Sequence, residues 1–211
     1  MSIPHKTLHY VYDPLCGWCY GAAPLLAAAA TLATVSIRLH PGGLWLGERR
    51  QRMGPALRDY VKPHDERIQA MTGQPFGEAY FNRLLLDETL MLDSAPPIRA
   101  ILAAGTLGAD ELTLLQRIQS AHYRDGVWVG DLATLTRLAT EQGLDEAAFR
   151  HAYEQQALEP ALRESQAWLR RLGGQGYPTL GLAWGDELHP IAVGAYLGDP
   201  AAFLARLQQG R

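Results

Sequence analysis

Cys16 and Cys19, three positions apart, are the residues of this chain with the clearest capacity for chemistry, and they are its only cysteines. A thiol-disulfide exchange centre needs one activated thiolate and a second thiol close enough to resolve the mixed disulfide. Positions i and i+3 of a helix lie on one face, roughly 5 Å apart, within the Cα separation that a disulfide accepts. So short a loop contributes little stability. The spacing therefore favours redox chemistry over a structural disulfide.

The position of each cysteine predicts its role. Cys16 is expected where a helix begins, and there the unpaired N–H groups and the positive end of the helix dipole favour a thiolate. It is the predicted nucleophile, and Cys19, one turn further in, is the predicted resolving cysteine. The intervening Gly17 and Trp18 add no positive charge, and Asp13 opposes ionisation if it points inward. We therefore expect a potential less oxidising than the value of about −120 mV known for the strongest oxidant of this type.

Two other interpretations of the cysteine pair compete with exchange chemistry. A zinc site would need two further ligands from seven scattered histidines. An inert buried pair is a second alternative, which the Asp13-Pro14 turn before the helix start disfavours. His9 and His40 are candidate proton donors near the cysteines, although such histidines are more often structural. The basic run Arg49, Arg50 and Arg52 is interpreted as a solvated face without a role.

The elements around the cysteines follow the order strand, helix, strand. Residues 7–12 are β-branched and aromatic and predict a strand that stops at Asp13-Pro14. Residues 16–32 are mostly alanine and leucine and predict a helix, and residues 35–39 predict a second strand.

The rest of the chain divides into a helical block and a returning sheet. Residues 47–173 carry helix start and stop signals, such as Asp131 and Asp145 as N-caps and Gly143 as a stop. Residues 179–184 and 188–193 then predict two strands around a Gly185-Asp186 turn, and residues 200–209 a closing helix. The fold class is therefore α/β, with residues 1–46 and 174–211 forming one domain around an all-helical insertion of residues 47–173.

Composition narrows the function classes. The 211 residues are 47% hydrophobic and 19% charged, which suits a globular protein with a sizeable core. A net charge of −3 gives no field that would gather nucleic acid or an anionic membrane. The start of the chain, Met1 to Lys6, lacks a long apolar stretch, so we expect a cytoplasmic protein without a leader or membrane anchor. The oligomeric state is left open.

The sequence resembles the thioredoxin superfamily, and within it the DsbA-like branch with a helical insertion, including its FrnE-like, predicted protein disulfide isomerase members. The segment Tyr12-Asp13-Pro14-Leu15-Cys16-Gly17-Trp18-Cys19 is similar to that branch's active-site segment, and Gly176-Tyr177-Pro178-Thr179 is similar to its cis-proline loop. The stretch 126–131 and the order of elements also match, so the resemblance covers nearly the whole chain. It implies a thioredoxin fold with a large helical insertion.

The resemblance also implies a set of substrate-binding residues. It makes Pro178 a cis proline packed against the cysteine pair, and it gives Tyr177 a backbone that pairs with an extended substrate. Gly17 and Trp18, beside the nucleophile, complete the expected substrate-binding residues. No bound cofactor or metal is expected, with glutathione as a possible co-substrate.

These observations predict a cytoplasmic thiol-disulfide oxidoreductase of reductase or isomerase type, acting on protein or small-thiol substrates. Periplasmic DsbA proteins carry histidine where Trp18 stands, and they have a secretion signal. Both differences argue against strong oxidation. A kappa-class glutathione transferase or isomerase is one alternative, although those enzymes usually show serine where Cys16 stands. A redox-sensing peptide-binding protein is another.

Overall fold

The computed structural model describes residues 6–209, and its centre is a four-stranded mixed sheet. The strands are β1 (Lys6–Tyr12), β2 (Val35–Pro41), β5 (Thr179–Trp184) and β6 (Glu187–Ile191), in the order β2-β1-β5-β6. β1 runs parallel to β2 and antiparallel to β5, and β5 runs antiparallel to β6. This is the predicted βαβ and ββα pair joined into one sheet. Residues 1–5, on which the expectation of no leader rests, lie outside the described residues.

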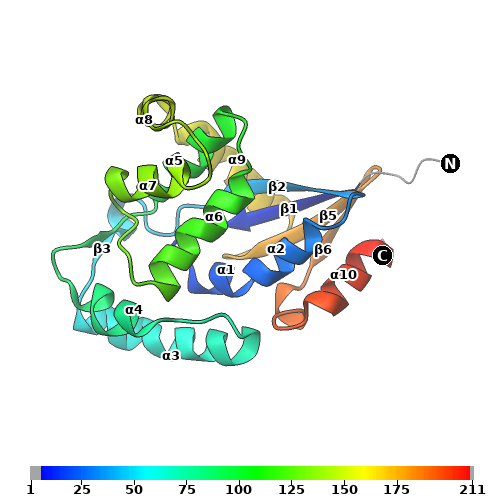
Figure 1. Cartoon of the computed structure of the whole chain (residues 1–211). Coiled ribbons are helices and arrows are strands. Elements are labelled where there is room, and N and C mark those ends of the chain that lie inside the picture. The colour runs from blue at the N-terminus through cyan, green and yellow to red at the C-terminus, as the bar shows by residue number, and fades with distance from the viewer. Residues whose placement is uncertain (1–5, 210–211) are drawn as a thin grey trace.

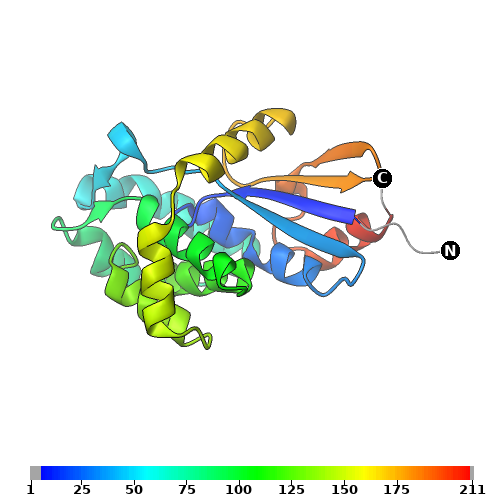
Figure 2. The ribbon, with the colours of Figure 1, turned by 90° about the horizontal axis from the view of Figure 1, so that it is seen from above.

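Helices cover both faces of this sheet (Figures 1 and 2). α1 (Gly17–Gly21), α2 (Ala23–Ala29) and α10 (Pro200–Gln209) lie on one face, and α9 (Glu159–Arg171) lies on the other against β2 and β1. Side chains alternate across β1, so Tyr10 points toward the helix that carries the cysteines and His9 points toward α9. One face of β1 therefore contacts the helix that carries the cysteines, and the other face contacts α9.

The helix expected over residues 16–32 is in fact two helices that meet at Ala22. Pro24 follows directly, and proline lacks the N–H that a continuous helix requires and is favoured in a first turn. The consequence is a single short turn, α1, that holds both cysteines.

The insertion is a layered helical block between β2 and α9. Its elements are η1 (Gly47–Arg49), β3 (Gln51–Arg52), α3 (Pro55–Thr72), α4 (Glu78–Asn82), η2 (Leu84–Leu86), β4 (Met91–Leu92), α5 (Ala95–Thr106), α6 (Glu111–Gln119), η3 (Ser120–Arg124), α7 (Leu132–Thr140) and α8 (Glu146–Gln155). The predicted caps are confirmed, since Asp131 and Asp145 accept hydrogen bonds from backbone N–H groups in the first turns of α7 and α8.

One feature of the insertion is not helical. β3 and β4 form a two-residue antiparallel ribbon, and the Met53 N–H extends it by donating to the Leu90 carbonyl at 3.0 Å. The ribbon satisfies backbone groups where the chain enters the insertion and where it passes from η2 to α5. A pairing of two residues is too short to leave a periodic pattern in the sequence. The predicted boundaries at residues 46/47 and 173/174 stay a prediction, because buried residues of both parts join one hydrophobic core.

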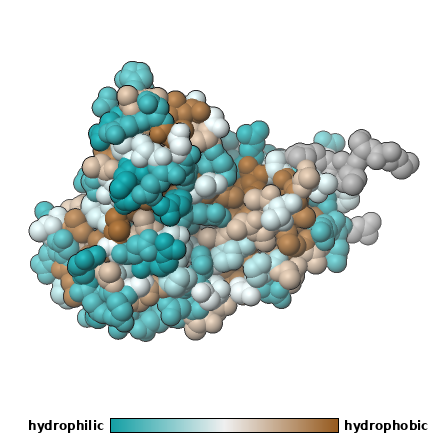
Figure 3. Space-filling view, in the orientation of Figure 1, coloured by the Kyte–Doolittle hydropathy of each residue, from teal (hydrophilic) through white to brown (hydrophobic). Residues whose placement is uncertain are grey.

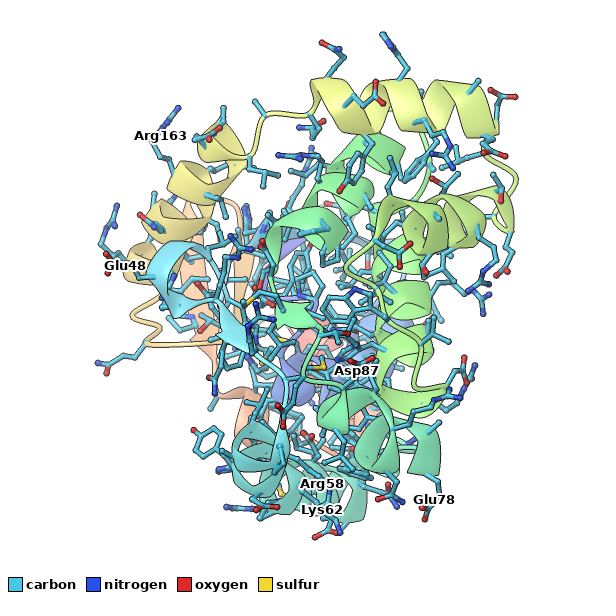
Figure 4. The ribbon with its side chains drawn as sticks, turned by 90° about the vertical axis from the view of Figure 1, so that its left-hand side faces the viewer. Glu48, Arg58, Lys62, Glu78, Asp87 and Arg163 are labelled. Atoms are coloured by element: carbon cyan, nitrogen blue, oxygen red, sulfur yellow. The ribbon has the colours of Figure 1, made fainter. Side chains whose placement is uncertain are left out.

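The surface is polar over the helical block. Figure 3 shows mainly hydrophilic residues there and a larger share of apolar residues where α2 and the sheet lie. In Figure 4 the charged side chains of Lys62 on α3 and Glu78 on α4 lie at the outer end of the molecule. Within residues 6–209, no helix combines the length and apolar character needed to cross a membrane.

Candidate active site

Cys16 is the N-cap of α1, directly after the turn that ends β1. Its thiol lies 3.5 Å from the backbone carbonyl of Tyr177 and donates to it. Only 6% of the Cys16 surface is exposed, so the predicted nucleophile sits at the bottom of a recess rather than on an open helix end. Both cysteines are free thiols. The structure therefore places a reduced pair beside the loop that the resemblance singled out.

Cys19 is fully buried one turn further along α1. Its sulfur accepts a hydrogen bond from the Asp13 N–H at 3.5 Å, and its carbonyl accepts one from the Tyr10 hydroxyl at 3.3 Å. Burial, followed by the hydrogen bond and charge of Cys16, raises the pKa of the Cys19 thiol well above its usual range. Cys19 is thus the protonated and covered partner, which agrees with the resolving role that we predict for it.

Asp13 points inward, as the sequence left open, but its carboxylate serves the backbone rather than the cysteines. It accepts hydrogen bonds from the N–H groups of Leu15 at 2.8 Å and Leu44 at 2.6 Å, and from the Ser94 hydroxyl at 3.1 Å. The Ser94 hydroxyl in turn accepts from the Trp45 N–H at 3.0 Å. Burial raises the pKa of Asp13, and these donors oppose that rise. The carboxylate therefore ties together the active-site turn, the loop after β2 and the start of α5.

The peptide bond between Tyr177 and Pro178 is cis, as the resemblance implied. The carbonyl of Tyr177 faces the Cys16 thiol. The Tyr177 hydroxyl donates to the Gly42 carbonyl at 2.8 Å. A Cβ atom on Gly42 would lie 2.0 Å from the Tyr177 ring, so only glycine fits there. Backbone and ring together fix the loop against the end of β2.

Two hollows meet at Trp18. The first, the cis-proline groove, has a volume of about 420 Å³ and is lined by Trp18, Arg67, Met71, Tyr177, Pro178, Val193, Gly194 and Leu197. The second, the α3 pocket, has a volume of about 250 Å³ and is largely apolar. Its lining includes Leu15, Cys16, Gly17, Trp18, Trp45, Leu57, Asp65, Ile68, Tyr80, His122 and Tyr123. The four predicted substrate-binding residues, Gly17, Trp18, Tyr177 and Pro178, thus line one hollow or both, and their binding role stays a prediction.

Sequence reasoning missed Asp65, which α3 places over the cysteine turn. Its carboxyl group is buried and accepts a hydrogen bond from the Tyr80 hydroxyl at 2.9 Å. Burial raises the pKa of this carboxyl group to about 7. A single aspartate in an amphipathic helix gives no sequence signal, because about 50 residues separate it from Gly17 and only the fold brings them together.

His9 and His40 are not proton donors for the cysteines, because they lie on the opposite face of the sheet under α9. His9 Nδ1 is 3.0 Å from His40 Nε2, and the His9 ring stacks on Trp168 at 3.6 Å between centroids. Burial lowers the pKa of both histidines to about 4. The pair instead packs α9 onto β1 and β2.

This histidine pair predicts that stability falls in mild acid. Between about pH 6.5 and pH 4 the unfolded chain binds protons that the folded histidines refuse, so the unfolding free energy should decrease as the pH falls through that window. The raised pKa of Asp65 works in the opposite direction. Urea unfolding of the wild type and of His9→Gln between pH 7.5 and 4.5 isolates the contribution of His9, because His40 and His122, whose pKa values are also lowered, remain in both proteins. A variant with an equally steep decline would contradict this account.

The arginine run makes structural contacts at the entrance of the insertion. Arg49 donates to the Gly43 carbonyl at 2.9 Å, Arg50 pairs with Asp93 at 3.0 Å, and Arg52 donates to the Glu88 carbonyl at 3.3 Å. None of the three lines either hollow at Trp18. Over the part of the chain that the structure describes, no group of three or more His, Cys, Asp or Glu residues could hold a metal ion.

Comparison with known proteins fits this geometry. The family model described as a DSBA-like thioredoxin domain matches residues 7–200. The chain belongs to the DSBA-like thioredoxin domain family. No curated protein sequence matches it.

This DSBA-like chain is similar to several solved structures. The cytosolic disulfide reductase DsbM from Pseudomonas aeruginosa is 44% identical with a TM-score of 0.89, over 96% of this chain and 97% of that one. The same reductase solved with GSH is 43% identical with a TM-score of 0.87, over 96% and 98% of the two chains. A putative protein disulfide isomerase from Nitrosomonas europaea, 24% identical with a TM-score of 0.80 over 98% and 100%, shares the fold.

The family confirms two of the predictions. The chain has the α/β thioredoxin fold with a helical insertion, and it is a thiol-disulfide oxidoreductase of the DSBA-like family. The roles of individual residues stay predictions.

Proposed function

We propose that this oxidoreductase is a cytoplasmic disulfide reductase that uses glutathione as its thiol co-substrate. The observation that carries the proposal is the position of the Cys16 thiol, 3.5 Å from the Tyr177 carbonyl at the junction of the two hollows. Support comes from the reductase that is 44% identical, which is described as cytosolic and was also solved with GSH. A reducing cytosol further favours reduction over net oxidation.

The cis-proline groove suits the peptide part of glutathione. A cysteinyl sulfur held at Cys16 places its own backbone beside the Tyr177 backbone, and extended backbone pairing is a common way to hold a peptide. Glutathione also carries two carboxylates. Arg67 lines the groove from α3, and its guanidinium lies 5.8 Å from the centre of the Trp18 ring. The groove thus offers a cation and a backbone edge to an anionic tripeptide.

The proposed reaction is two successive exchanges. The Cys16 thiolate attacks one sulfur of a disulfide, a new bond to that sulfur forms, and the other half leaves as a thiolate that takes up a proton. The Cys19 thiol loses its proton and attacks the Cys16 sulfur, which releases the second half and leaves a Cys16–Cys19 disulfide. Two glutathione molecules then reduce this pair and leave as glutathione disulfide.

A coupled assay tests the proposal. Reduction of a glutathione mixed disulfide by the wild-type protein, with glutathione reductase and NADPH consuming glutathione disulfide, should saturate with glutathione concentration. If dithiothreitol supported reduction and glutathione did not, glutathione would be the wrong co-substrate.

Arg67→Gln should raise the KM for glutathione about 10- to 150-fold, because one charge-assisted contact contributes about 1.5–3 kcal/mol. Its kcat should change little, because Arg67 does not touch the cysteines in this account. Arg58→Gln, on the same helix but outside the groove, is the matched control. An unchanged KM in Arg67→Gln would remove Arg67 from the glutathione site.

The intact Cys16 argues against the kappa-class alternative, in which serine usually stands at this position. Transfer of glutathione to an electrophile without reduction of any disulfide would favour that class. A redox-sensing peptide-binding role would be favoured instead if Cys16→Ser preserved the cellular function and Tyr177 substitutions abolished it.

A further inference from the structure

The α3 pocket contains one carboxyl group, and it lies over the residue between the two cysteines. Asp65 is 4% exposed, and its Oδ2 accepts from the Tyr80 hydroxyl at 2.9 Å. A Cβ atom built on Gly17 would lie 2.5 Å from Oδ1, so this oxygen contacts the cysteine turn itself. One oxygen is therefore anchored and the other is directed at the turn that carries Cys16.

The surroundings of Asp65 raise its pKa, so that a large fraction of the molecules carries the carboxyl proton near neutral pH. The pocket is largely apolar, and its lining contains no lysine or arginine. The titratable groups that share the pocket with Asp65 are Cys16, Tyr60, His64, Tyr80, His122 and Tyr123. His122 is neutral, because burial lowers its pKa to about 3. Burial raises the pKa of the carboxyl group to about 7, with only the hydrogen bond from Tyr80 lowering it, and this value suits proton transfer at neutral pH.

We propose that Asp65 is the general acid that protonates the departing thiolate when Cys16 attacks a disulfide whose leaving half lies in the α3 pocket. The inference rests on the proposed function, because it concerns the first exchange of that reaction. In this step the bond between the two substrate sulfurs breaks, and a bond forms from Cys16 Sγ to the half that lies in the cis-proline groove. The proton of Asp65 moves to the leaving sulfur, which departs as a neutral thiol, and solvent water returns a proton to the carboxylate.

The geometry separates the two halves of the substrate. Trp18 lines both hollows, and Cys16 lines the α3 pocket while its sulfur contacts the cis-proline loop. When a glutathione moiety occupies the cis-proline groove, the apolar α3 pocket remains available to the other half of a mixed disulfide. A thiolate released into an apolar pocket is poorly solvated, and a neighbouring acid removes that cost. The favoured substrate class is a glutathione mixed disulfide of a small apolar thiol.

Two mixed disulfides of similar size test the acid directly. Glutathione joined to benzyl mercaptan has a weakly acidic leaving thiol, which needs a proton to leave well. Glutathione joined to 4-nitrothiophenol has a strongly acidic leaving thiol, which departs readily as the thiolate. Single-turnover release of each thiol from the reduced protein is followed for the wild type, Asp65→Asn and Tyr80→Phe. The Tyr80→Phe variant removes the hydrogen bond and keeps the carboxyl group.

Asp65→Asn should slow release of benzyl mercaptan about 10²-fold and release of 4-nitrothiophenol less than about 3-fold. Tyr80→Phe should keep the preference for benzyl mercaptan release, and the pH at which the ratio of the two rates falls should move upward, because the hydrogen bond from Tyr80 lowers the pKa of Asp65. In the wild type the benzyl rate divided by the nitrophenyl rate should fall as the pH rises through about 7, because Asp65 loses its proton there. The ratio cancels the ionisation of Cys16, and it should be flat in Asp65→Asn.

Equal slowing of both substrates in Asp65→Asn would show a structural role and overturn the proposal, as would no slowing of either. A wild-type ratio independent of pH between 6 and 8.5 would overturn it as well. If the wild type released neither thiol, the proposed function itself would fail. If it released both and Asp65→Asn behaved like the wild type, only the role of Asp65 would fail.

Discussion

Cys16→Ser should lower disulfide reduction at least about 10³-fold, to the rate of the uncatalysed exchange with glutathione. A serine hydroxyl is not ionised at neutral pH and cannot form a disulfide, so the first exchange has no nucleophile. The structure leaves no substitute, because the second thiol is fully buried and its pKa is raised well above the usual range. Glutathione-dependent reduction of a mixed disulfide is the measurement.

Cys19→Ser is the matched control for the same pair. It keeps the attacking sulfur and removes the group that resolves the mixed disulfide, so the protein should accumulate an adduct at Cys16 that mass spectrometry detects. The adduct also identifies substrates in a cell extract. An adduct on Cys19 in the Cys16→Ser variant, at the rate of the Cys16 adduct, would reverse the roles assigned to the two cysteines.

Asp13→Ala should lower the unfolding free energy by about 3–5 kcal/mol, because each buried donor left without its acceptor costs about 1–3 kcal/mol and three donors are affected. The substitution leaves the N–H groups of Leu15 and Leu44 and the hydroxyl of Ser94 without their acceptor. Since these three groups belong to the cysteine turn, the loop after β2 and the start of α5, the loss should also loosen the active site. Urea unfolding at pH 7 gives the free energy.

Ser94→Ala provides the reference loss of unfolding free energy for this experiment. It removes one of the three donors to the carboxylate and the acceptor of the Trp45 N–H, so it should cost about 1–2 kcal/mol. A loss in Asp13→Ala no larger than that in Ser94→Ala would mean that water replaces the carboxylate, and it would contradict the proposed link between the two parts of the fold.

Local patterns account for much of the fold. The β-branched and aromatic residues 7–12 predicted β1, and the strand signals before the Gly185-Asp186 turn predicted β5. The N-caps Asp131 and Asp145 predicted where α7 and α8 begin. These elements can be predicted from the sequence because each signal arises from residues within one turn or one strand. The cysteine pair is likewise a local signal, since both sulfurs belong to the same helical turn.

The parts that sequence reasoning missed depend on contacts between distant segments. Asp65 lies over Gly17 only because α3 packs against α1, and Ser94 reaches Asp13 from the other end of the insertion. The strand pair β3 and β4 is two residues long, too short for any periodicity. His9 and His40 were predicted as candidate proton donors for the cysteines. The register of β1 and β2 instead directs both side chains to the face of the sheet opposite the cysteines.

The recess around Cys16 has a consequence for the choice of substrate in the cell. Because Cys16 is a buried residue with 6% exposure, its sulfur meets only a disulfide that can enter the hollow on either side of Trp18. A disulfide held flat within a rigid, folded protein lacks that reach, whereas a small thiol adduct or a disulfide on an extended chain has it. The protein should therefore discriminate by shape, clearing thiol adducts from its surroundings while leaving the cross-links of correctly folded proteins intact.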